Sequence, residues 1–172
     1  MRAAVVTVSD RSFRGERPDL SGPVLKQLLE EAGAHVVEAV VVPDDPSVIA
    51  QALIRLADEI RCELVFTTGG TGLSPRDTTP EATKRVIDKE VPGMEEAIRQ
   101  ESLKTTPFAM LSRGMVGVRG HTLILNFPGS PKAVKECFAV VEPVLAHAVK
   151  LLRDENPYAD TDHSCQPSRS LS

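Results

Sequence analysis

The sequence has few cysteines, no excess of basic residues and no long apolar run, and each absence excludes a class of protein. Its cysteines, Cys62, Cys137 and Cys165, are widely spaced and odd in number, which indicates neither a disulfide framework nor a zinc cluster. The formal net charge is -4 at pH 7, so no global positive field favours a nucleic-acid partner. Nothing resembles a signal region or a membrane span. We expect a reduced, cytoplasmic protein with no nucleic-acid or membrane partner.

The order of apolar segments predicts the fold class. The 172 residues suit one domain with a substantial core. Because β-branched apolar runs alternate with segments of helical period, we expect a three-layer α/β domain whose mostly parallel sheet carries helices on both faces. Strands are expected at 3–8, 36–42, 63–68, 116–118 and 121–127. Helices are expected at 21–33, 46–60, 80–90 and 93–104, and from Pro131 onward, with Pro143 kinking or splitting the last one. The domain is expected to span 1–153, with a mobile polar tail at 154–172.

Polar residues follow four of the expected strands. Ser9 and Asp10 follow the first strand, and Asp44 follows the second. The run "TTGGTG" (67–72) follows the third strand, and "PGSPKA" (128–133) follows the last. In open α/β sheets ligands bind beyond the carboxyl ends of the strands, so we expect these segments to meet at one edge.

The two glycine-containing segments suit anion binding. Gly69, Gly70 and Gly72 permit positive φ and let backbone N–H groups approach a ligand. The run is neither a Walker A loop nor a dinucleotide fingerprint, and a plain turn is an equal alternative. In the second segment Ser130 is expected as the N-cap. Lys132 in the first helical turn opposes the helix dipole unless it contacts a bound anion or points to solvent.

Two aspartates remain after helix capping is assigned. Asp45 is expected to cap the helix that follows it, which leaves Asp44 without a structural role. Thr78 and Glu81 fit a capping box, with Thr79 as a competing cap position, which leaves Asp77. Two spare carboxylates beside phosphate-suited turns predict Mg²⁺ binding, although each could also form a turn. The residues therefore predict a domain that binds a phosphorylated ligand with Mg²⁺ and leave the ligand open.

Other polar residues are expected to be structural. Glu95 and Arg99 are four apart and read as a solvated helix face. Cys62 and Cys137 are expected to be buried thiols. The histidines are scattered without metal-ligand spacing, at positions 35, 121, 147 and 163.

Several motifs together resemble a known family. The segments "TTGGTG", "PRDTTPEAT", "KTTPFAMLSR" and "LNFPGSPKAVKECF" occur in the order seen in the molybdopterin-binding domain family. The likeness is closest to its molybdopterin adenylyltransferases, including the G domain of gephyrin, and covers about residues 3 to 153. The segment "PDLSGP" (18–23) departs from the commonest form, "DRSGP".

The resemblance implies an activity and a set of site residues. Such proteins are homotrimers that transfer AMP from ATP to the terminal phosphate of molybdopterin, releasing pyrophosphate with Mg²⁺. Their product passes to the molybdate-inserting enzyme of the pathway, which would be a partner. The motif positions make Asp44 and Asp77 the catalytic acids, which would hold Mg²⁺ directly or through water. The implied substrate-binding residues are Ser9, Asp10, Thr68, Gly69, Gly70, Thr71, Gly72, Ser112, Gly129, Ser130, Pro131 and Lys132.

Three alternatives stay open. The chain could be a molybdopterin-binding or carrier protein of the same fold without catalysis, although the presence of Arg76-Asp77 and Thr79-Pro80-Glu81 favours the enzyme. A scaffold role like that of gephyrin would need additional domains, which we do not expect. A generic phosphate-sensing module would bind ATP tightly without a pterin.

Overall fold

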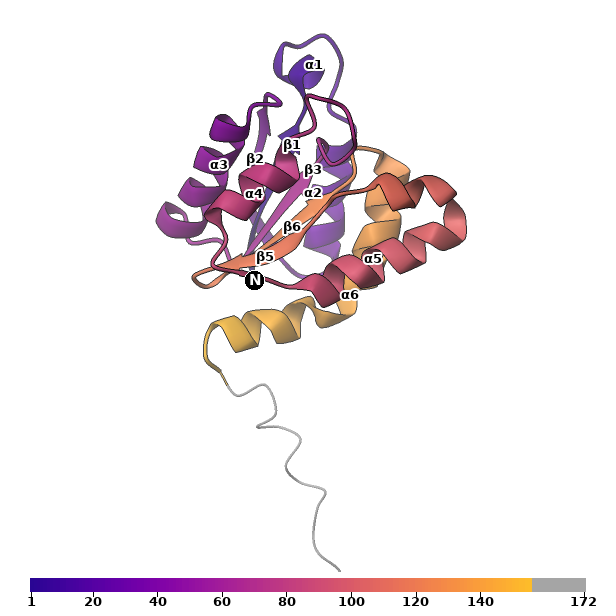
Figure 1. The fold of residues 1–172 in the computed structure, drawn as a ribbon. Coiled ribbons are helices and arrows are strands. Elements are labelled where there is room, and N and C mark those ends of the chain that lie inside the picture. Colours follow the sequence, from indigo (N-terminus) through magenta and orange to yellow (C-terminus); the bar gives the residue numbers. More distant parts are fainter. Residues whose placement is uncertain (156–172) are drawn as a thin grey trace, which may run out of the picture.

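A six-stranded sheet forms the centre of the molecule, and its strand order is β2-β1-β3-β6-β5-β4. The computed structural model describes residues 1–155 (Figure 1). β1 (Arg2–Val8), β2 (His35–Val42), β3 (Leu64–Thr68) and β6 (Thr122–Phe127) are parallel. β5 (Val116–Arg119) and β4 (Lys89–Glu90) extend this sheet in antiparallel pairing. The mostly parallel sheet is confirmed.

Helices cover both faces of the sheet (Figure 1). One face packs against α2 (Ser21–Glu31), α5 (Pro92–Thr105) and α6 (Pro131–Leu152). The other packs against α3 (Pro46–Ile54), which continues as the π-helical turn η1 (Arg55–Glu59), and α4 (Thr79–Val86). The short helices α1 (Asp10–Phe13) and η2 (Pro107–Leu111) are the remaining elements of residues 1–155. The three-layer prediction is confirmed.

Strand alternation explains why two separate cores form. Successive side chains of a strand point to opposite faces. Accordingly Leu64 and Phe66 lie in the core beneath α2 and α6, whereas Val65 lies in the core beneath α3 and α4. Phe66 also meets Phe127 edge to face, with ring centroids 5.2 Å apart. The strands are buried on both faces, which is why they read as continuous apolar runs.

The segment after α4 differs from the prediction. A helix was expected over 80–90, but it ends at Val86, and Lys89 and Glu90 pair with β5 instead. The Asp88 N–H donates to the Val118 carbonyl at 2.7 Å and so fixes this edge strand. Pro92 disfavours helical geometry in the residue before it, which helps to separate this segment from α5.

Helix α5 carries a second difference. Glu95 and Arg99 were expected to face solvent, yet both bind the sheet edge. Glu95 Oε1 accepts a hydrogen bond from the Val116 N–H at 2.8 Å, and Arg99 Nη1 donates to the Gly114 carbonyl at 3.0 Å. A spacing of four residues fits a solvent-exposed ion pair as well as a pair that binds neighbouring backbone. Only the tertiary contact shows that Glu95 and Arg99 form the second kind.

Three smaller expectations have clear outcomes. Helix α6 is continuous through Pro143, but its yellow end runs in a different direction from its orange start (Figure 1), so the proline bends the helix without splitting it. Cys62 and Cys137 are buried, and burial raises the pKa of each thiol to about 11. Residues 156–172, with most of the expected tail, lie outside the described residues, and the expected domain boundary stays a prediction.

Candidate active site

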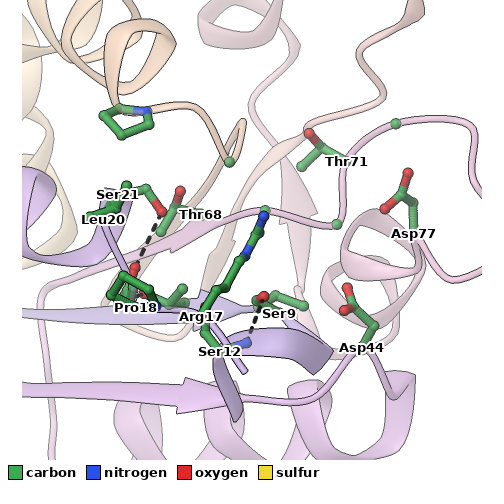
Figure 2. Close-up of a pocket in the computed structure, with 18 residues that line it drawn as sticks. Ser9, Ser12, Arg17, Pro18, Leu20, Ser21, Asp44, Thr68, Thr71 and Asp77 are labelled. Carbon is green, nitrogen blue, oxygen red and sulfur yellow. Dashed lines mark hydrogen bonds between the residues drawn. The ribbon is translucent and has the colours of Figure 1, made fainter. Parts of the chain in front are cut away.

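The carboxyl ends of the four parallel strands meet at one edge of the sheet. The Gly69 N–H at the end of β3 donates to the Phe127 carbonyl at 3.0 Å, and the Ser9 N–H after β1 donates to the Val42 carbonyl at 3.0 Å. Beyond these ends lies a cavity of about 530 Å³ (Figure 2). Its lining comprises Thr7, Val8, Ser9, Ser12, Arg17, Pro18, Asp19, Leu20, Ser21, Asp44, Thr68, Gly69, Gly70, Thr71, Gly72, Asp77, Gly129 and Pro131.

Glycine is required in the turn after β3. Gly69 and Gly70 have φ of 101° and 66°, which is the left-handed region that L side chains rarely adopt. A Cβ on Gly69 would also lie 2.4 Å from the Val8 carbonyl oxygen. The turn therefore brings bare backbone against β1 and into the cavity, as the glycine pattern predicted.

Thr79 holds this turn, and the predicted capping box is wrong. The Thr79 N–H donates to the Gly70 carbonyl at 3.1 Å, and its hydroxyl donates to the Gly69 carbonyl at 2.9 Å. Thr78 occupies the N-cap position of α4 without a side-chain capping bond. Glu81 forms an ion pair with Arg113 instead of reaching back to the cap. The start of α4 is thus fastened to the glycine turn by Thr79.

Asp44 has a structural role that the sequence did not reveal. Its Oδ2 accepts a hydrogen bond from the Asp10 N–H at 2.7 Å, and Asp10 Oδ1 accepts one from the Asp44 N–H at 3.0 Å. This reciprocal pair joins the chain beyond β1 to the chain beyond β2. Asp45 caps α3 as expected, accepting from the Ser47 and Val48 N–H groups.

Asp77 is also partly engaged. Its Oδ2 accepts a hydrogen bond from the Ser74 N–H at 3.0 Å, which closes the turn before α4. Each aspartate therefore uses one carboxylate oxygen, Oδ2, to hold the local backbone, as the turn-forming alternative predicted. Its other oxygen, Oδ1, makes no such contact with residues 1–155 and stays available to a ligand, as the spare-carboxylate prediction requires. Figure 2 shows Asp44 and Asp77 on the same side of the cavity.

The acidic side chains influence one another. Burial raises the pKa of the Asp44 carboxyl, and the negative charges of Asp10 and Asp77 raise it further, against the opposing effect of the Asp10 N–H. At Asp10 desolvation also acts upward, but the Asp44 N–H and the Arg76 guanidinium outweigh it, so the pKa of Asp10 is lowered. Arg76 donates to both Asp10 oxygens, at 3.0 and 2.9 Å. This site favours a cation close to Asp44.

A second cavity of about 440 Å³ adjoins the first. The two share Ser9, Arg17, Asp44 and Asp77. The rest of the second lining is Asp10, Arg11, Arg14, Ser74 and Arg76, so it is rich in arginine. One cavity therefore has a glycine turn, the other has arginines, and both carboxylates lie at their junction.

The donor set fits Mg²⁺ carried by a phosphorylated ligand. Among residues 1–155 no group of three or more histidine, cysteine, aspartate or glutamate side chains could hold a metal by itself. Within those residues the Oδ1 atoms of Asp44 and Asp77 accept no hydrogen bond. Mg²⁺ is commonly held by one or two carboxylates together with substrate phosphates, and this pair supplies the carboxylates.

Arg113 is a site residue that the sequence did not identify. Arg113 lies about forty residues further along the chain than the loop from Thr71 to Asp77. It contacts that loop through both its backbone N–H and its guanidinium group. Nε donates to the Gly72 carbonyl at 2.8 Å, and Nη2 donates to the Asp77 carbonyl at 2.7 Å. Its backbone N–H donates to the Thr71 carbonyl at 2.9 Å. Arg113 therefore positions the loop that carries Asp77, and the sequence offers no local signal for this role.

Asp19 was also missed. Its Oδ2 accepts a hydrogen bond from the Thr7 hydroxyl at 2.7 Å, and its Oδ1 accepts one from the Gly22 N–H at 2.9 Å. Asp19 therefore binds an N–H in the first turn of α2, whose N-cap position is Leu20, and ties that helix to β1 beside the cavity. An aspartate just before a helical pattern is an N-cap signal, so the sequence could have indicated it.

The structure separates the remaining predicted residues. Gly129 and Pro131 line the main cavity, whereas Ser130 is an exposed N-cap residue without a side-chain cap bond. The Lys132 side chain is 77% exposed and lies 3.9 Å from Glu136. Ser112 lines a different cavity of about 200 Å³ between α5, η2 and α6. Substrate binding by Ser112, Ser130 and Lys132 stays a prediction.

The fold and the site define a three-layer α/β domain with an anion-suited site at the carboxyl ends of its strands. Residues 4–147 match the family model described as "Probable molybdopterin binding domain". This match covers most of the chain, so the chain belongs to the molybdopterin-binding domain family.

Two sequence relatives and one solved structure agree with this family membership. The molybdenum cofactor synthesis protein cinnamon of Drosophila melanogaster is 44% identical over 170 residues, which are 95% of this chain but 28% of that longer protein. The molybdopterin adenylyltransferase of Helicobacter pylori (strain J99) is 43% identical over 150 residues, or 86% of this chain and 85% of the relative. Among solved structures, the molybdopterin biosynthesis enzyme MoaB from Thermus thermophilus has a TM-score of 0.84 and 47% identity, covering 90% of this chain and 97% of that one.

Proposed function

We propose that this chain transfers AMP from ATP to the terminal phosphate of molybdopterin and releases pyrophosphate. The observation that carries the proposal is the junction of two cavities at Asp44 and Asp77. A transfer between two phosphorylated substrates needs both phosphates at one point. The shared carboxylates mark such a point, with a glycine turn on one side and arginines on the other.

Each cavity is assigned one substrate. The phosphate of molybdopterin lies against the turn from Thr68 to Gly72, where glycine leaves backbone N–H groups accessible. The triphosphate of ATP lies in the cavity lined by arginine, whose guanidinium groups match phosphate geometry. Gly129 and Pro131 complete the first subsite, and Ser9 and Asp10 border the second.

The reaction needs positioning and charge neutralisation more than covalent help from the protein. An oxygen of the molybdopterin phosphate attacks the α-phosphorus of ATP. The bond from that phosphorus to the oxygen bridging to the β-phosphate breaks, and pyrophosphate leaves with the electron pair. Asp44 and Asp77 would hold Mg²⁺ directly or through water, and Mg²⁺ would neutralise the charge on the triphosphate oxygens.

The first experiment measures adenylylation directly. Purified protein is mixed with molybdopterin and Mg-ATP, and adenylylated pterin and pyrophosphate are quantified. The Asp44→Asn and Asp77→Asn variants should each lose about a hundredfold or more in kcat, because each removes a carboxylate that would hold the Mg²⁺ neutralising the triphosphate charge. Asp45→Asn is the matched control, since Asn caps a helix as well as Asp and Asp45 lines neither cavity.

Two results would contradict this proposal. Native protein that binds molybdopterin but yields no product would be a carrier of the same fold. An Asp77→Asn variant with the native rate would remove Asp77 from the catalytic site.

The assembly and location are further parts of the proposal. We expect a homotrimer, and the exposed Phe108 and Met110 side chains on η2 offer apolar surface that a second copy could cover. Sedimentation equilibrium tests this, and a stable monomer would contradict it.

We also expect a cytoplasmic protein that delivers its product to the molybdate-inserting enzyme. Among residues 1–155 none of the helices is both long and apolar enough to cross a bilayer, and Cys62 and Cys137 are free thiols.

A further inference from the structure

The arginines around the second cavity differ in how far their charge is already neutralised. Arg76 donates two hydrogen bonds to Asp10, and Arg14 forms an ion pair with Glu16 at 2.7 Å. These two guanidinium groups are therefore held by carboxylates of the protein. A phosphorylated ligand meets them as ion pairs whose charge is largely compensated.

Arg17 is different from both. Within residues 1–155 it makes no hydrogen bond and no ion pair, and its side chain is exposed to the cavities. It lines both cavities, whereas Arg11, Arg14 and Arg76 line only the second. Figure 2 shows the Arg17 side chain extending into the cavity from the segment between α1 and α2. An uncompensated cation thus stands where the two cavities meet.

The charges nearby make this position significant. Asp44 and Asp77 line the same junction, so two protein carboxylates already face it. Two phosphorylated substrates would add several more negative charges at this point. A guanidinium can neutralise part of that charge through two parallel N–H···O bonds, which a lysine ammonium cannot form in the same geometry.

We infer that Arg17 binds the triphosphate of ATP at the junction of the two cavities and stabilises the charge of the departing pyrophosphate. This inference rests on the proposed function for the identity of the reaction. Its binding part requires only that a triphosphate occupies the second cavity. Arg17 donates hydrogen bonds throughout and transfers no proton, while the bond between the α-phosphorus and its bridging oxygen breaks.

The test separates nucleotide binding from turnover. Arg17→Gln and Arg17→Lys are compared with the native protein by calorimetric titration with the magnesium complex of α,β-methylene-ATP, which cannot be cleaved. The Gln variant should bind this analogue about ten- to a hundredfold more weakly, because it loses hydrogen bonds to a charged group. The Lys variant should recover part of this affinity but not the native kcat. Affinity for molybdopterin should stay within about twofold of the native value.

Arg85→Gln is the matched control. Arg85 is an exposed arginine of α4 that lines neither cavity and forms no hydrogen bond or ion pair with the described residues. Its substitution should leave analogue affinity and turnover unchanged. Because Arg17 makes no such contact either, its substitution should not alter folding, and thermal unfolding of each variant checks this.

The outcomes distinguish this inference from the proposed function. Unchanged analogue affinity in Arg17→Gln would overturn the role of Arg17, even if the native protein adenylylates molybdopterin. A loss confined to molybdopterin affinity would also overturn it. If the native protein forms no adenylylated product, weaker analogue binding by Arg17→Gln would still support a triphosphate site at Arg17, while the proposed transfer would fail.

Discussion

Asp10 and Asp44 each accept a hydrogen bond from the other's backbone N–H, at 3.0 and 2.7 Å. The pair fastens the ends of β1 and β2 and at the same time holds two carboxylates side by side. The carboxylate of Asp44 is thereby fixed in orientation while burial and its acidic neighbours raise its pKa.

Asp44→Asn should make the protein more stable at pH 7 while it abolishes most of the activity. The folded-state pKa of Asp44 lies above its ordinary value of 3.8, so the folded state holds the proton more tightly than the unfolded state. Stability therefore falls as pH rises from about 3.8 through the folded pKa, and the deficit persists at pH 7. Asn removes this deficit and still accepts the Asp10 N–H.

Urea unfolding with EDTA present measures this effect, because bound Mg²⁺ would stabilise the native protein. The gain should be present at pH 7 and should vanish below about pH 3.8. Asp45→Asn should change the free energy of unfolding little, since Asn is an equivalent cap. An Asp44→Asn variant that is less stable than native at pH 7 would contradict the electrostatic account.

Arg76→Gln should destabilise the protein at neutral pH and lose this effect in acid. The folded pKa of Asp10 is lowered, so its contribution is present above the ordinary value of 3.8 and is lost as pH falls through the folded pKa. Removing the guanidinium raises that pKa. Arg76 is largely exposed, so the loss at pH 7 should not exceed about 1 kcal/mol.

Unfolding curves between pH 3 and pH 8 test this dependence. Arg14→Gln is the comparison, because the Glu16 carboxylate that Arg14 pairs with is 50% exposed, whereas the Asp10 carboxylate is 21% exposed, so this ion pair should matter less. A difference between Arg76→Gln and native protein that is the same at every pH would assign Arg76 a packing role instead.

Gly69→Ala should disrupt the glycine turn. The positive φ of Gly69 and the 2.4 Å approach to the Val8 carbonyl together should cost more than about 2 kcal/mol of stability. Gly93→Ala in α5 is the matched control, since no atom lies within 4 Å of its added Cβ and alanine favours helices. That variant should be as stable as native or more stable by up to about 1 kcal/mol. Thermal unfolding of both proteins decides; equal stability would refute the steric argument.

Arg113→Ala should reduce turnover without direct contact to the reacting groups. The substitution frees the Gly72 and Asp77 carbonyls from their guanidinium donor, so the loop carrying Asp77 loosens. A small displacement of a catalytic group costs about ten- to a hundredfold in rate. Trypsin should also cut the variant faster after Arg76.

Arg119→Ala is its control. Arg119 binds Asp58 and the Val86 carbonyl in a similar clamp away from both cavities, so its loss should lower stability but not kcat. Arg113→Ala with native kcat and native resistance to trypsin would show that the loop is held by other contacts.

Local patterns in the sequence were sufficient for the layers of the fold. Apolar alternation placed the strands, and helical period placed the helices, because both signals are set by residues near in the chain. Parallel strands with crossover helices share one carboxyl edge, so Ser9, Asp44 and Gly69 were predicted to meet there. The same local rules were wrong for the Thr78–Glu81 capping box and for Lys89–Glu90, where tertiary hydrogen bonds compete with a helical turn.

The sequence by itself determined the three-layer architecture, the edge at which the site lies and the two carboxylates within it. Only the tertiary structure decided how those groups are used. The reciprocal bond of Asp10 with Asp44, the clamp of Arg113 on the Asp77 loop and the place of Arg17 between two cavities each join residues with no periodic relation in the chain. Hydrogen bonding and charge compensation depend on distances in space, whereas a sequence pattern reports only neighbours within a few residues.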